Sequence, residues 1–203
     1  MKYLGIYIDD KLSFNFHISQ LVTKIAKTIG IISKLRYFSN LAILKQVYYA
    51  LIYPHLIYGI VIWGNSRSSY LTQLQNKQNK IVNIMHFSPH GRLFDPLSYK
   101  RSNILKIGDL CLIQSATFLF DFKNGNLPPI FNNYFKLKSE NCNIRTRNNI
   151  DSYYLEFTQT KFAKLCIKSN AVAAWDSVPN ILKKLSKKHI FKKQLQKHIL
   201  KAY

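Results

Sequence analysis

Two adjacent carboxylates stand near the start of the chain, in the run Tyr7-Ile8-Asp9-Asp10. Paired aspartates can hold Mg²⁺ during phosphoryl transfer, so this run is a candidate catalytic site. Two ions about 3.5–4 Å apart need further carboxylate oxygens from a separate strand, yet the sequence has no Asp or Glu between Asp10 and Asp95. The alternative is a strand followed by a turn, where an Asp side chain bonds the nearby backbone. We prefer the turn, and the sequence therefore predicts no catalytic residue.

A second metal-like pattern is the pair His86 and His90, whose spacing of four residues would suit two ligands on one helix. Pro89 lies between them and interrupts a helix, and no third ligand is obvious. The chain has three widely spaced cysteines and no C-x-x-C pair: Cys111, Cys142 and Cys166. These cysteines indicate neither zinc nor a disulfide framework, and they suit a reducing compartment. We predict no metal site and an intracellular protein that is not secreted.

Charge is the most informative property of the composition. Of 203 residues, 30 are Lys or Arg and 9 are Asp or Glu, which gives a formal net charge of +21. A chain this basic repels itself unless an anionic partner neutralises it, and the usual partners are nucleic acid and an acidic membrane surface. The hydrophobic fraction of 47% excludes a disordered tail and allows a real core.

The candidate binding residues are basic side chains that helical periodicity places opposite apolar stripes, together with two arginines in a polar segment. Lysine contacts phosphates without reading sequence. The alternative is an ordinary solvated face on the helices and a surface loop at the arginines. The lack of interspersed carboxylates favours phosphate contact on the helices. The candidates are Lys24, Lys27, Lys34, Lys77, Lys80, Arg145, Arg147, Lys192, Lys193 and Lys197.

The lysine run over residues 183–201 follows the last acidic residue, Asp176. It is typical of an RNA-binding tail, a nuclear-import address or an amphipathic surface helix. The alternative is a helix that docks through Phe191, Leu195 and Ile199. Both hold together if one face of the helix packs while the other binds.

The elements that must position these residues are mainly helices. Residues 2–12 are rich in β-formers and predict an extended segment, after which Ser13 is a candidate helix cap. A further helix is expected to begin at Ser186. Breaks near residues 88–96 predict a domain boundary. Apolar periodicity predicts helices over about 13–34, 41–52, 54–63, 68–85 and 104–122.

Residues 46–66 carry no charged side chain and approach the length of a membrane span. Pro54-His55 interrupts this run, and its tyrosines are spread out instead of gathering at the two ends. We prefer two buried helices joined near Pro54; a membrane-associated or structural helical protein is the alternative function. Trp63 and Trp175 could stack on bases, but their apolar surroundings favour core packing.

Several motifs follow one another in order along nearly the whole chain. They are YLGIYID at 3–9, LSF at 12–14, HI at 17–18, YYALIYPHL at 48–56, YG at 58–59, WG at 63–64, LQNK at 74–77, KIV at 80–82, LP at 127–128, RTR at 145–147, WDSVP at 175–179 and FK at 191–192. This order resembles the C-terminal part of non-LTR (LINE-type, jockey-like) retrotransposon reverse transcriptases. In that resemblance Asp9 matches a position after the catalytic motif, and Asp10 has no catalytic counterpart. Lys80, Asp176 and Val178 depart from the usual Arg, Asn and Leu, and Lys80 lacks the bidentate fork of arginine.

The resemblance implies a fragment of an RNA-directed DNA polymerase. We expect a mainly α fold: a palm β remnant over 1–12, a helical thumb-like domain over 13–88, and a helical C-terminal segment with a basic tail over 89–203. The fingers and catalytic palm aspartates would precede Met1, so we expect no activity from the chain alone and no cofactor, since Mg²⁺ would need the palm. The implied partner is an RNA/DNA duplex bound without sequence preference, in the nucleus or cytoplasm, with no small-molecule substrate.

Overall fold

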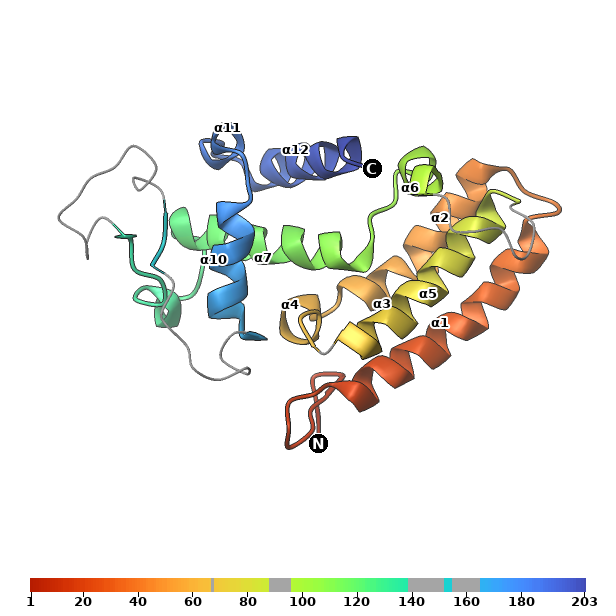
Figure 1. Ribbon diagram of the computed structural model, residues 1–203, viewed down its shortest axis with the longest axis horizontal. Helices are drawn as coiled ribbons and strands as arrows, with labels where there is room; N and C mark the ends of the chain where they lie inside the picture. Colours follow the sequence, from red (N-terminus) through yellow and green to blue (C-terminus); the bar gives the residue numbers. More distant parts are fainter. Residues whose placement is uncertain (67, 88–95, 139–151, 155–164) are drawn as a thin grey trace. The chain divides into compact units, whose positions relative to one another are not determined.

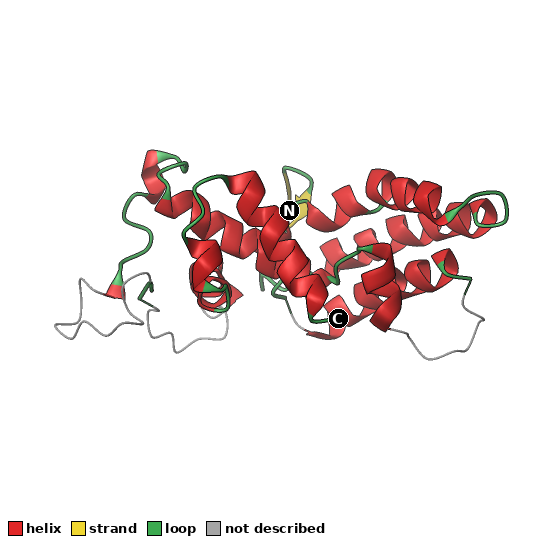
Figure 2. Cartoon of the chain, turned by 90° about the horizontal axis from the view of Figure 1, so that it is seen from above, coloured by secondary structure: helices red, strands yellow, loops and turns green. Residues whose placement is uncertain are grey.

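The computed structural model is mainly helical, with one two-stranded hairpin near the N-terminus (Figures 1 and 2). It describes residues 1–66, 68–87, 96–138, 152–154 and 165–203. The expected fold class, mainly α with a short N-terminal β segment, is confirmed. The chain divides into two compact units: the first is Met1–Leu110 with Ile199–Tyr203, and the second is Cys111–His198. The predicted domain limits at 12/13 and 88/89 stay predictions.

The N-terminal segment is a tight hairpin and not the single extended run that the sequence predicts. Strands β1 (Lys2–Tyr3) and β2 (Ile6–Tyr7) pair antiparallel, with Tyr3 opposite Ile6. The two residues between the strands, Leu4 and Gly5, have φ of 44° and 83°. A two-residue turn whose backbone twist matches that of the strands needs positive φ at both positions, and glycine supplies one of them without strain.

Helix α1 (Asn15–Leu35) begins without the predicted Ser13 cap. Its N-cap residue is Phe14, in the left-handed region at φ 54°, and no side chain of that residue caps the helix. Asp9 instead reaches across the turn: its Oδ1 accepts hydrogen bonds from the backbone N–H groups of Ser13, at 2.7 Å, and Phe14, at 3.3 Å. An acidic side chain next to the N-terminus of a helix also complements the helix dipole. Asp9 therefore fixes the turn that leads into α1, and the Ser13 hydroxyl donates to Asp9 instead of capping the helix.

The first unit is built on a helical bundle. Helix α2 (Leu41–Leu51) follows the predicted range closely and begins at Asn40, whose Oδ1 accepts the Ile43 N–H at 3.0 Å. Helix α5 (Ser68–Met85) matches its prediction. Figure 1 shows α1 and α5 side by side and running in the same direction, and the two helices are in direct contact. The aliphatic stripe of α1 is buried in this bundle.

The predicted helix over 54–63 is broken into α3 (Tyr53–Ile57) and α4 (Ile60–Trp63). The break lies at Gly59, which has φ 61°. A Cβ at this position would come within 2.5 Å of Ile6 Cδ1, so the hairpin packs directly against the glycine backbone. Among the described residues, no helix combines the length and apolar character that a membrane crossing requires. The charge-free run instead supplies fully buried core side chains: Tyr48, Ile52, Leu56, Ile60 and Trp63.

A buried hydrogen-bond network joins α5 to the segment that follows α6 (Pro96–Ser102). Gln78 donates to the Tyr48 hydroxyl and to the Leu105 carbonyl, both at 2.8 Å. Gln75 donates to the Tyr99 hydroxyl at 2.8 Å, and its Oε1 accepts the Ile107 N–H at 3.0 Å. Ile107 is the first residue of α7 (Ile107–Lys123), so Gln75 caps a helix from outside it. This explains why α7 begins three residues later than predicted.

The second unit gathers the rest of α7 with the short helix η1 (Pro129–Phe131), α10 (Ile167–Asp176), α11 (Asn180–Lys183) and most of α12 (Lys188–Lys201). Its core contains Phe120 stacked on Phe191 at 4.6 Å between ring centroids, with Trp175 5.9 Å from Phe191. Trp63 and Trp175 are both fully buried, which confirms their predicted place in the core. Helix α7 ends at Lys123, and the φ of 68° at Gly125 just beyond it is typical of a glycine that terminates a helix.

The terminal helix begins at Lys188, two residues beyond the predicted Ser186 start. Its first hydrogen bond runs from the Phe191 N–H to the Lys187 carbonyl. The predicted apolar stripe is correct for Phe191 and Leu195, which are buried, but Ile199 is only half-buried.

Candidate nucleic-acid interface

The three candidate lysines of α1 lie on its outer face. Lys24, Lys27 and Lys34 are exposed. The residues three and four positions from Lys27 and from Lys34 are all exposed, because side chains repeat about every 3.6 residues around a helix, whereas Lys24 lies three positions from buried Leu21 and borders the buried stripe. The buried stripe consists of Ile18, Leu21, Ile25, Ile29 and Ile32. The helix therefore presents its cations to solvent and its aliphatic side chains to the core, as the sequence predicts.

Helix α5 carries the next two candidates. Lys80 is exposed and Lys77 is half-buried. The network of Gln75 and Gln78 fixes the rotation of α5 about its axis, because both amides are held by hydrogen bonds on the inner side of the helix. The LQNK motif thus has a positioning role: its glutamine packs inward while its lysine lies nearer the surface.

These five lysines lack anionic partners. The sequence has no Asp or Glu between Asp10 and Asp95. Within the described part of the chain, the side chains of Lys24, Lys27 and Lys34 form no salt bridge or hydrogen bond, and the same holds for Lys77 and Lys80. Cations without local counter-charges create a positive surface potential that attracts a polyanion.

The far end of the α1–α5 pair carries an arginine among aromatic rings. The Arg36 guanidinium lies 4.7 Å from the centroid of the Tyr37 ring and 5.3 Å from that of Phe87, and it donates to the Tyr37 hydroxyl at 2.9 Å. The Tyr37 and Phe87 rings are both exposed. Cation–π contacts of this kind hold a guanidinium in place while leaving it charged. Arg36 directly follows the last residue of α1, and its contact with Phe87 joins residues that are far apart in the sequence.

The side chains of the acidic pair Asp9 and Asp10 accept hydrogen bonds within the turn before α1. Asp9 Oδ1 accepts two backbone N–H groups, and its Oδ2 accepts the Ser13 hydroxyl. Partial burial opposes ionisation of Asp9, but the hydrogen bonds from Ser13 and Phe14 outweigh it and hold the pKa of the carboxyl below its usual value. Asp10 accepts from the Lys11 N–H at 3.1 Å. Among the described residues, no group of three or more potential metal-ligating side chains occurs.

The candidates of the C-terminal region are less uniform. Lys193 and Lys197 are exposed on α12, whereas Lys192 is half-buried. Burial and the nearby Lys188 lower the pKa of Lys192, although Asp121 partly opposes that shift. Arg145 and Arg147 lie outside the described residues. The predicted phosphate contacts of this region stay predictions.

Two further lysines of the second unit have a role that the sequence analysis missed. Lys183 is only 7% exposed, and its ammonium lies 5.7 Å from the centroid of the Trp175 ring. The Lys123 ammonium lies 5.9 Å from the same ring and donates to the Lys183 carbonyl at 3.4 Å. No local sequence pattern predicts this cluster, because its three members come from α7, α10 and α11.

Comparison with known proteins gives one informative match. No protein-family profile matches the chain, and no solved structure matches it. The chain is similar to the "Probable RNA-directed DNA polymerase from transposon X-element" of Drosophila melanogaster, with 33% identity over 91 residues. The match covers 41% of this chain and 10% of that polymerase. The chain is thus related in part to a retrotransposon RNA-directed DNA polymerase, and it spans a small part of that relative's length.

Proposed function

We propose that this chain is the thumb and C-terminal part of a retrotransposon RNA-directed DNA polymerase, and that it holds a nucleic-acid duplex by the backbone phosphates. The observation that carries the proposal is the outer face of α1 and α5, where five lysines stand without a carboxylate partner among the described residues. The partial similarity to a transposon polymerase supports the same class of partner.

The chemistry of these side chains favours binding without sequence preference. Sequence readout requires hydrogen bonds to base edges, typically from Arg, Asn or Gln in a groove. The candidate face instead presents ammonium groups, which contact phosphates as point charges. Such binding draws much of its free energy from counterion release and weakens as salt concentration rises. An RNA/DNA duplex is the partner we propose, and its location would be the nucleus or the cytoplasm.

The chain alone is proposed to bind without polymerising. Both oxygens of Asp9 already accept hydrogen bonds from the turn that starts α1, which leaves them poorly placed to hold Mg²⁺. A metal cofactor would enter only together with a catalytic palm. Primer extension by the purified chain with Mg²⁺ or Mn²⁺ tests this part of the proposal, and template-dependent synthesis would contradict it.

The binding test is a salt titration of a fluorescently labelled RNA/DNA duplex. Each phosphate contact contributes about 0.9 to the slope of log affinity against log salt concentration. We expect the triple variant K24Q/K27Q/K34Q to lower that slope by about 2–3 and to weaken binding equally for unrelated duplex sequences. The charge-matched control K11Q/K136Q/K184Q removes three exposed lysines outside the candidate set and should retain most of the slope. Equal losses in the two triple variants would show that only total charge matters.

A further inference from the structure

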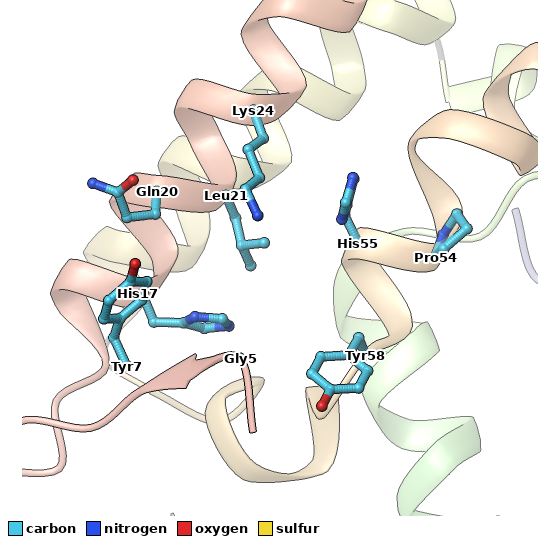
Figure 3. A pocket seen from close by; sticks show the side chains of 9 residues that line it. All are labelled: Gly5, Tyr7, His17, Gln20, Leu21, Lys24, Pro54, His55 and Tyr58. Atoms are coloured by element: carbon cyan, nitrogen blue, oxygen red, sulfur yellow. The ribbon is translucent and has the colours of Figure 1, made fainter. Parts of the chain in front are cut away.

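A cavity of about 270 Å³ lies in the first unit between the hairpin, α1 and α3. Its walls include Tyr7 and Gly5 of the hairpin region, His17 and Lys24 of α1, and Tyr58 after α3. Figure 3 shows Lys24 reaching from α1 and His55 from α3 into the same space, with the His17 and Tyr58 rings nearer the hairpin. This volume is near the lower end of the about 300–1,000 Å³ range of small-molecule pockets. It suits one small ligand and not a helical duplex.

The walls of this cavity are held by tertiary contacts. The Tyr58 hydroxyl donates to the Leu4 carbonyl in the hairpin turn. Ile6 packs against the backbone of Gly59, where a Cβ would collide with it. His17, Gln20 and Lys24 repeat at intervals of three and four along α1 and therefore share one side of the helix. Contacts between the hairpin, α1 and the α3–α4 segment thus hold the lining residues in place.

His17 lines the cavity and has a buried ring nitrogen without a partner. The residue is 4% exposed, and its Nε2 has no hydrogen-bond partner. Its ring packs edge-on against Trp63, with 5.7 Å between centroids. Burial, together with the positive charge of Lys24, lowers the pKa of His17 and so favours the neutral imidazole. A buried polar atom without a partner is costly, and a ligand that supplies a hydrogen bond would remove that cost.

The lining residues also define the chemistry of the ligand. None of them is a carboxylate, and Lys24 provides a cation, so the charge of the cavity favours an anion. The Tyr7, Tyr58 and His17 rings favour a planar group. We propose that this cavity binds a nucleoside monophosphate unit, with its phosphate toward Lys24 and His55 and its base among the rings of His17 and Tyr58.

This site differs from the phosphate-binding face of α1 and α5, although Lys24 belongs to both. The ligand is a single nucleotide, either free or at the end of a strand, and the sequence analysis predicts no such small-molecule site. Lys27 separates the two proposals, because it lies on the duplex-binding face and does not line the cavity. The variant K27Q should weaken duplex binding and leave the binding of a free nucleotide unchanged.

Calorimetric titration of the full chain with AMP at constant ionic strength tests the proposal. We expect a dissociation constant below about 1 mM, with adenosine alone and inorganic phosphate alone at least about tenfold weaker. If a 5′-phosphorylated oligonucleotide displaces AMP, the natural ligand of the cavity is the end of a nucleic-acid strand. If only free nucleotides displace AMP, the natural ligand is a free nucleotide. Absence of AMP binding at about 1 mM would overturn the proposal.

Two variants assign the binding to these residues. His17→Phe keeps the ring and removes the unpaired nitrogen, so we expect AMP affinity to fall about tenfold or more while the melting temperature stays equal or rises by a few degrees. Lys24→Gln should weaken AMP about threefold to tenfold without a change in melting temperature. Unchanged AMP affinity in both variants would overturn the assignment. If His17→Phe fails to fold, the AMP affinities of Lys24→Gln and Lys27→Gln still test the assignment, because only Lys24 lines the cavity.

Discussion

The two units of this protein use lysine in opposite ways. On α1 of the first unit, Lys24, Lys27 and Lys34 are exposed and have no partner among the described residues. In the second unit, the Lys188 ammonium lies 2.5 Å from an Asp121 oxygen, and Lys183 packs over Trp175. The difference arises from where carboxylates and aromatic rings lie. A net charge of +21 therefore does not describe one uniform basic surface.

The largest loss of stability is expected from a substitution at Trp175, whose ring contacts the ammonium groups of Lys123 and Lys183. Trp175→Ala removes a fully buried side chain and the ring that faces Lys123 and Lys183. We expect the free energy of unfolding to fall by about 3–5 kcal/mol, measured by urea denaturation. Trp175→Phe keeps an aromatic ring and should cost clearly less. If the two variants lose the same free energy of unfolding, the aromatic ring does not stabilise the nearby lysines.

A smaller loss is expected when the charge of Asp121 is removed. Asp121→Asn preserves the shape of the side chain but weakens its contact with Lys188. It also removes the negative charge that favours the protonated form of half-buried Lys192. Because Lys188 remains about half-exposed, we expect a loss of about 1–2 kcal/mol in urea denaturation. The matched control is Asp176→Asn, whose contact to Lys138 is 3.9 Å long between partly exposed side chains. That control should change stability by less than about 0.5 kcal/mol.

The outward lysines should contribute almost nothing to stability. Substitution of Lys24, Lys27 and Lys34 by glutamine removes no contact within the described residues, so we expect each change to stay within about 0.5 kcal/mol. Relief of repulsion among like charges would make the sign slightly favourable. Urea denaturation and duplex affinity are measured for the triple variant. Together they test whether the lysines of the first unit serve binding while those of the second unit serve stability. A cooperative loss of stability would show that these lysines are structural.

The smallest effect is a pH dependence at His17. Its pKa is lower in the folded chain than the unfolded value of 6.5, so the unfolded state binds the proton more readily. The stability that depends on neutral His17 is present above pH 6.5 and is lost as the pH falls through the folded pKa. Thermal unfolding between pH 7.5 and 5.5 should therefore show a smaller decline in His17→Phe than in the unmodified chain. Equal declines would place the titrating group elsewhere.

Local patterns predict most of the helices of the first unit but not their ends. The ranges of α2 and α5 follow from apolar periodicity, because one face of each helix is buried. The break at Gly59 depends on Ile6, more than fifty positions away, and the start of α1 depends on the Asp9 side chain in place of Ser13. A residue pattern contains no information about which distant backbone will approach.

The sequence alone determines the fold class, the buried tryptophans and the outward direction of the α1 lysines, because helical repeat and hydrophobicity are local properties. Only the tertiary structure decides which cations are neutralised, since Asp121 and Lys188 lie 67 residues apart. It likewise decides that His17 and Lys24 meet His55 around one cavity. Ion pairs and cavities depend on distances in space, and the folded chain sets those distances by packing remote segments together.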